Sequence, residues 1–236
     1  MILISRRPVV LVMSDTPQFL EFSVPCPDVG KSLAWYRELG FTELLAGDIR
    51  THHYAVITDG DLCIGLHAND YPSAGLCFVQ QNLARRVRQG QAAGTRYEFA
   101  HLGEDEFHEA ALLDPDGTLA VLLEARTFSG ALSSVATPVI GRFSHIALPC
   151  TQLPNSIEFW QDFGFIAVTA MELERTELHI PGLAVEMIPG ERRITLHFKP
   201  DNLNDCIHAI EHDNPVRKTG AGYELVAPEG TRITMS

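Results

Sequence analysis

The stretch FLEFSVPCPDVGKSLAWYRELGF, residues 19–41, returns later in the chain as FSHIALPCTQLPNSIEFWQDFGF, residues 143–165. The two stretches align without a gap. Pro25-Cys26 falls on Pro149-Cys150, and Gly40-Phe41 falls on Gly164-Phe165. Self-similarity over such a length indicates an internal repeat. The sequence therefore predicts two copies of one domain.

Each copy has the pattern of a strand followed by a helix and further strands. In the first copy, Leu20, Phe22 and Val24 alternate with the residues between them, as in a strand. Asp28 can cap a helix that ends at Gly40. Residues 75–94 and 195–213 also correspond, each as a strand and a helix, with Asn82 and Asn202 as the expected helix caps. Each copy ends in a tight turn and a strand. The predicted pattern is therefore βαβββ twice in each copy.

The domain limits follow from a stretch rich in Ser, Gly and Pro, Arg126 to Val139, which is typical of a linker. We predict an N-terminal extension at residues 1–18, a first domain at 19–135 and a second at 136–236. The extension resembles a weak signal peptide, but its apolar run is short and no cleavage site follows. Met1 and Met13 both stay open as the natural start.

Composition limits the classes of function. The chain has 30 acidic and 18 basic residues, a formal net charge of −12, and 45% hydrophobic residues. Such a surface repels phosphate backbones and anionic lipid, so nucleic acid and membrane are not expected partners. No apolar run approaches the roughly 20 residues of a membrane span. Five scattered cysteines without a CxxC pair argue against a thiolate zinc site and favour the cytoplasm.

The helix sequence SLAWYRELGF at residues 32–41, with DPDG at residues 114–117, resembles the vicinal oxygen chelate superfamily. That superfamily includes glyoxalases, bleomycin-resistance proteins and extradiol dioxygenases. The resemblance covers residues 19–236 and implies an α+β fold of two tandem glyoxalase-like domains. Each domain would be built from paired βαβββ modules that form an open, barrel-like sheet. It also implies metal ligands on the first, fourth, fifth and eighth strands of a domain.

The resemblance places two ligand types in the second copy, His145 on the first strand and Glu186 on the fourth. The fifth-strand position is Thr195, but His197 lies two residues further on the same face, about one strand repeat (roughly 7 Å) away. The eighth-strand position is Thr234, where extradiol dioxygenases have a glutamate. His145, Glu186 and His197 together are the donors that suit Fe, Mn, Ni or Zn.

The first copy has fewer ligand types. Its four positions are Glu21, Gly65, Gly75 and Val121, with His67 two residues beyond Gly65. Glu21 is a candidate catalytic carboxylate, able to move a proton if it comes within hydrogen-bond reach of a substrate. We therefore expect the first copy to be mainly a scaffold and the second to carry any chemistry.

Three functions remain open. The first is a metal-dependent lyase or isomerase, or with less support a dioxygenase, acting on a small oxygenated substrate. The second is a metal-free small-molecule-binding protein of the bleomycin-resistance type, in which His145 and Glu186 bond to each other. The third is a protein that offers only an interaction surface. Sheet edges leave a homodimer open, and the sequence does not reveal the substrate.

Overall fold

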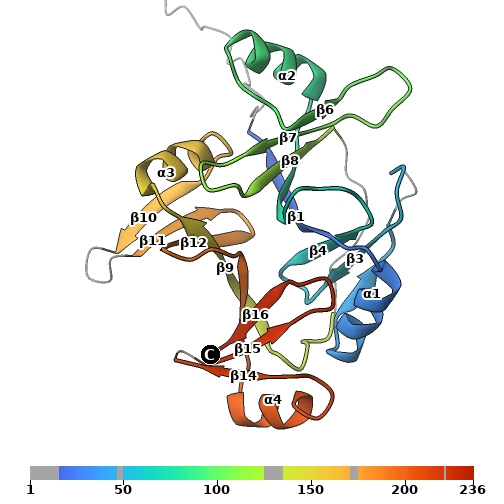
Figure 1. Cartoon of the computed structure of the whole chain (residues 1–236), viewed down its shortest axis with the longest axis vertical. Helices are drawn as coiled ribbons and strands as arrows, with labels where there is room; N and C mark the ends of the chain where they lie inside the picture. Colours follow the sequence, from blue (N-terminus) through green and yellow to red (C-terminus); the bar gives the residue numbers. More distant parts are fainter. Residues whose placement is uncertain (1–15, 47–49, 125–134, 171–174, 221) are drawn as a thin grey trace, which may run out of the picture.

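The computed structural model of the chain describes residues 16–46, 50–124, 135–170, 175–220 and 222–236. The predicted N-terminal extension, with Met13, and most of the predicted linker lie outside them. The described residues form two eight-stranded mixed sheets and four helices (Figure 1). None of these helices is both long enough and apolar enough to cross a membrane.

The first sheet contains two βαβββ modules. Its strand order is β2-β3-β4-β1-β5-β8-β7-β6, so the two modules meet where β1 pairs with β5. The elements of the first module are β1 (Gln18–Pro25), α1 (Val29–Glu38), β2 (Thr42–Leu44), β3 (Tyr54–Thr58) and β4 (Cys63–His67). Those of the second are β5 (Gly75–Val79), α2 (Leu83–Ala92), β6 (Phe99–His101), β7 (Glu109–Leu113) and β8 (Leu119–Leu123).

The second sheet repeats this topology, with the order β10-β11-β12-β9-β13-β16-β15-β14. Its first module consists of β9 (Arg142–Cys150), α3 (Leu153–Gln161), β10 (Ile166–Ala170), β11 (Arg175–Ile180) and β12 (Leu183–Pro189). Its second consists of β13 (Thr195–Lys199), α4 (Leu203–Ile210), β14 (Arg217–Thr219), β15 (Gly222–Val226) and β16 (Arg232–Met235). The predicted α+β fold of tandem, paired βαβββ modules is confirmed.

Local signals explain where helices begin, with one correction. The Asp28 carboxylate accepts a hydrogen bond from the backbone N–H of Lys31 at 3.0 Å, as expected of a helix cap. Asn82 was expected to cap α2, but its side chain makes no capping bond. Instead the Glu124 carboxylate accepts from the N–H of Leu83 at 3.1 Å. A residue brought in by the neighbouring strand therefore replaces the local cap.

The two sheets share one core. Phe22 and Val24 of β1 belong to the same buried cluster as Ile146 and Leu148 of β9. The first helix of each half of the chain, α1 or α3 (Figure 1), also forms hydrogen bonds with the other half. On α1, the Trp35 indole N–H donates to Asn214 at 2.6 Å and the Tyr36 hydroxyl donates to Glu229 at 2.9 Å. On α3, the Trp160 indole N–H donates to Asp114 at 3.1 Å.

Candidate active site

Four neighbouring strands of the second sheet, β12, β9, β13 and β16, bring the candidate residues to one face. His197 lies directly opposite His145 in the pairing of β13 with β9, and Thr234 lies opposite His197 in the pairing of β16 with β13. Glu186 lies opposite Ala147, two residues after His145 and hence on the same face. The structure thus brings together the three predicted metal ligands of this copy and Thr234.

The side chains in this row are in contact. His145 Nε2 is 3.1 Å from Glu186 Oε2. The rings of His145 and His197 stack with their centroids 4.2 Å apart and their planes 12° apart. His197 Nδ1 is 2.8 Å from the Thr234 hydroxyl oxygen. The four side chains form one connected polar row.

A β-bulge sets the position of His145. The register of β9 against β13 shifts between His197 and Phe198, and the extra residue on β9 is Ser144. The Ser144 hydroxyl is 3.2 Å from His145 Nδ1. Bulges redirect side chains beside functional sites. His197 lies two residues after Thr195, the expected fifth-strand ligand position. Because of the bulge, it is nevertheless His197 that pairs with His145.

The donor types in this row fit a divalent metal, but the third ligand is not in place. Two imidazoles and a carboxylate are a set that binds Fe, Mn or Zn. The 3.1 Å between His145 Nε2 and Glu186 Oε2 is close to the roughly 3 Å that separates neighbouring donor atoms on one metal with bonds of about 2.1 Å. Within the described part of the chain, however, no three His, Cys, Asp or Glu side chains form such a group. His197 would have to leave its stack on His145 to complete the set.

Access and charge favour a site on this face. The His145 side chain is 23% exposed, whereas that of Glu186 is 9% exposed and lies almost buried behind it. Arg232, two residues before Thr234, extends the same row and bonds to Glu224 at 2.8 Å. Sequence reasoning missed this arginine and glutamate. The alternation of Arg232 and Thr234 with Ile233 along β16, and of Glu224 with Leu225 along β15, was the signal that placed them on this face.

The corresponding face of the first sheet holds Glu21 in a buried pair. Glu21 Oε1 is 2.8 Å from His67 Nε2 and accepts a 3.0 Å hydrogen bond from the Ser23 hydroxyl. Both partners of the pair are fully buried. His52, to which the sequence gave no role, lies 3.1 Å from His67 Nδ1. The predicted catalytic Glu21 therefore lies on the other sheet from His145, enclosed by its own partners.

Burial and neighbouring charge shift the pKa values in this buried group. Burial alone would raise the pKa of the Glu21 carboxyl. The His67 imidazole, with smaller contributions from Arg50 and Ser23, outweighs burial and leaves that pKa below its ordinary value. Burial, assisted by His67 and Arg50, lowers the pKa of His52 to about 4. His52 is therefore neutral at physiological pH.

The glycines of the first sheet do not leave an open cavity. A Cβ on Gly65 would collide with the Glu21 carboxylate and the His67 ring, and one on Gly75 would collide with the backbone of Leu119. The space at Gly65 is therefore filled by the Glu21–His67 pair. This contrasts with the polar row on the second sheet, where His145, His197 and Thr234 are partly accessible.

No family model matches this sequence, and no curated protein matches it. Solved structures do match, over 94% of this chain in each case. One is the Mn(II)-bound glyoxalase from Novosphingobium aromaticivorans, at 15% identity and a TM-score of 0.59, with 81% of that chain covered. An extradiol ring-cleaving dioxygenase from B. fuscum matches at 15% identity and a TM-score of 0.60, with 73% covered. Homoprotocatechuate 2,3-dioxygenase from Arthrobacter globiformis matches at 11% identity and a TM-score of 0.60, with 79% covered.

The chain has the vicinal oxygen chelate fold. The row from His145 to Thr234 lies on β9, β12, β13 and β16. These are the strands on which the resemblance in the sequence predicted ligands. Identities of 11–15% establish the fold and leave the reaction open. The comparison therefore shows the fold of this chain, and its own residues must indicate what it does.

Proposed function

We propose that the chain is a glyoxalase-like enzyme that acts on a small oxygenated substrate at the exposed face of the second sheet. In this proposal, His145 and Glu186 hold a divalent metal, with His197 as the third ligand. The observation that carries it is the His145–Glu186 pair, with donor atoms 3.1 Å apart and His197 stacked alongside. A bound divalent metal would supply Lewis-acid polarisation of substrate oxygens.

The protein's own groups have separate tasks in this proposal. The bond between Thr234 and His197 Nδ1 fixes the orientation of the ring. When Nδ1 carries the proton, Nε2 keeps its lone pair for a ligand or a substrate proton. Glu186 supplies negative charge that neutralises a cation at the site. Glu21 is given no step, because its pair with His67 encloses it in the first sheet.

Elemental analysis tests the metal. Protein purified without a metal-affinity tag or chelator should contain about one Fe, Mn, Ni or Zn ion per chain, as a site with three protein ligands requires. The His145→Ala variant should lose it, because one of the two donors already in place is removed. His179→Ala is the matched control, since this histidine lies on the same sheet and is half exposed, paired with Glu177. A full metal content in His145→Ala would contradict the proposal.

A second function has one observation in its favour. The three donors do not converge, and His145 faces Glu186 directly, as in a metal-free binding protein of the bleomycin-resistance type. In that case, protein reconstituted with each metal should retain none. Ligand binding should then be saturable and unchanged by a chelator.

Two further expectations belong to the proposal. The domain limits at residues 135 and 136 rest on the Ser- and Gly-rich linker. A cytoplasmic location is supported by five buried cysteines, each with a free thiol.

A further inference from the structure

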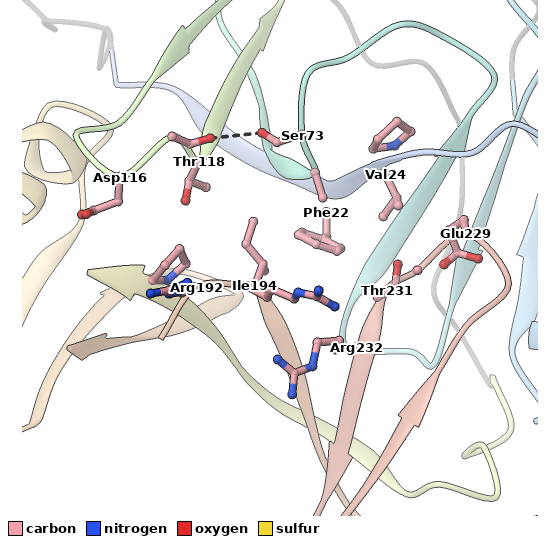
Figure 2. A pocket seen from close by; sticks show the side chains of 16 residues that line it. Phe22, Val24, Ser73, Asp116, Thr118, Arg192, Ile194, Glu229, Thr231 and Arg232 are labelled. Carbon is pink, nitrogen blue, oxygen red and sulfur yellow. Dashed lines mark hydrogen bonds between the residues drawn. The ribbon is translucent and has the colours of Figure 1, made fainter. Parts of the chain in front are cut away.

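A pocket lies between the two sheets, and its lining includes Arg232 but none of His145, Glu186, His197 and Thr234. Its volume is about 310 Å³, at the lower end of the range of roughly 300–1,000 Å³ for small-molecule sites. Two corresponding turns form opposite walls, Asp116–Thr118 from the first sheet and Glu229–Thr231 from the second (Figure 2). The loop between β12 and β13 supplies a third wall with Arg192, Arg193 and Ile194.

One part of the pocket is apolar. Phe22 and Val24 of β1 line it with side chains that otherwise belong to the shared core. Ile194 and Pro149 face it from the second half of the chain. This part can take the hydrocarbon body of a ligand but no charged group.

Buried polar atoms without partners also line the pocket. Thr118 is 2% exposed, and its hydroxyl has no hydrogen-bond partner among the described residues, whereas the Thr231 hydroxyl, 8% exposed, contacts the Tyr36 side chain. The Glu229 carboxylate uses Oε1 to accept from Tyr36, while Oε2 is buried without a partner in the same part of the chain. Each such group costs about 1–3 kcal/mol when it stays unpaired. Figure 2 shows the Thr118 side chain pointing into the pocket.

Positive charge gathers at the loop wall of this otherwise acidic protein. Arg192 and Arg193 are exposed and form no ion pair with any described residue, whereas Arg232 is paired with Glu224 and Glu191. Figure 2 shows Arg192 and Arg232 across the pocket from Ser73 and Thr118. The Asp116 carboxylate also lines the pocket, and its oxygens accept hydrogen bonds from Thr151 and Ser156.

We propose that this pocket binds a small hydroxycarboxylate, an organic acid with a hydroxyl group beside its carboxylate and an apolar body. Arg192 and Arg193 bind the carboxylate, because guanidinium groups match its geometry. The Thr118 hydroxyl and the free oxygen of Glu229 bind the hydroxyl. None of the proposed metal ligands lines the pocket, so the two proposed sites share no ligand residue, although Arg232 lies beside both.

Calorimetric titration with 3-phenyllactate tests the ligand class. We expect saturable binding at millimolar concentrations or below. Two matched compounds each lack one recognised group: 3-phenylpropionate lacks the hydroxyl, and 3-phenyl-1,2-propanediol lacks the carboxylate. Each should bind about tenfold more weakly or worse, since a hydrogen bond to a charged partner contributes roughly 1.5–3 kcal/mol.

Variants locate the binding. Arg193→Gln should weaken 3-phenyllactate binding about tenfold, while Arg88→Gln on α2 removes the same charge outside the pocket and should leave it unchanged. Thr118→Val replaces an unbonded hydroxyl with a methyl group of the same shape. It should weaken the binding of 3-phenyllactate and leave that of 3-phenylpropionate and the unfolding temperature unchanged. Absence of saturable binding, equal binding in Arg193→Gln and Thr118→Val, or loss of binding in His145→Ala would each overturn the proposal.

Discussion

Replacing His67 by leucine should lower the free energy of unfolding by about 3–5 kcal/mol at neutral pH, the cost of leaving a buried carboxylate without its partner. Glu21 would remain charged and fully buried, with only the Ser23 hydroxyl and more distant Arg50 to stabilise it. Urea unfolding followed by circular dichroism measures the effect. A small domain has about 5–15 kcal/mol of stability in total, so this change removes a large share.

A double variant shows whether the charge is the cause. Glu21→Met combined with His67→Leu replaces both polar partners by apolar side chains of similar size, which is often close to neutral. It should recover most of the stability that His67→Leu loses. If the double variant were as unstable as His67→Leu, the cost would come from packing around Gly65, and the assignment to the buried charge would be wrong.

The pair also fixes the sign of a pH dependence. The pKa of the Glu21 carboxyl is lower in the folded protein than in the unfolded chain. Its contribution to stability is therefore fully present above the ordinary pKa and is lost as the pH falls through the folded-state pKa. In His67→Leu, burial raises the pKa of the same carboxyl, so that acidification should stabilise the variant relative to wild type. Unfolding curves measured from neutral to mildly acidic pH should therefore converge, and curves that stayed parallel would contradict this reading.

Replacing Trp160 by alanine should cost about 3–5 kcal/mol, the range for a large aromatic side chain removed from a core. Trp160 is fully buried, and its ring lies 6.5 Å from that of Phe78 and 5.7 Å from that of Phe165, measured between centroids. The change leaves a cavity and also takes the indole N–H from Asp114, whose pKa burial already raises. Thermal unfolding followed by near-ultraviolet circular dichroism measures the loss.

Two control variants separate the contributions. Trp160→Phe keeps most of the ring volume and removes only the N–H, so it should cost about 1–2 kcal/mol. Ile166→Ala truncates a side chain that is largely exposed on the edge strand β10, and should change stability by less than about 0.5 kcal/mol. A loss below about 1 kcal/mol in Trp160→Ala would show that the contact between the halves stabilises little.

Most of the fold could be predicted because its signals are local and occur twice. The repeat from Phe19 and from Phe143, the strand alternation and the caps at Asp28 and Asn202 all indicate the modules. The cap of α2 could not be predicted in this way. Its carboxylate comes from Glu124, more than forty residues along the chain, and only the folded sheet brings the two together.

The residue types of the candidate site could be predicted from the sequence. The contacts between their side chains could not. His145 and Glu186 follow from resemblance, since their strands can be counted from the repeat. The stacking of His145 on His197 depends on the bulge at Ser144, which has no clear sequence signal. The buried group of Glu21, His67 and His52 depends on strand register and on a loop residue, neither of which the sequence pattern reveals.

The core shared by the two sheets has a consequence during synthesis on the ribosome. The first half, residues 16–124, completes its own sheet, but Trp35 and Tyr36 still lack Asn214 and Glu229, and Phe22 and Phe78 lack the facing side chains of the second half. At about 5–20 residues per second, the remaining chain takes roughly 5–20 s to emerge. Throughout that interval the nascent protein presents an apolar sheet face, which is a binding surface for chaperones and for other nascent copies. The solubility of the nascent first half therefore depends on the synthesis of the second half, which covers this apolar face.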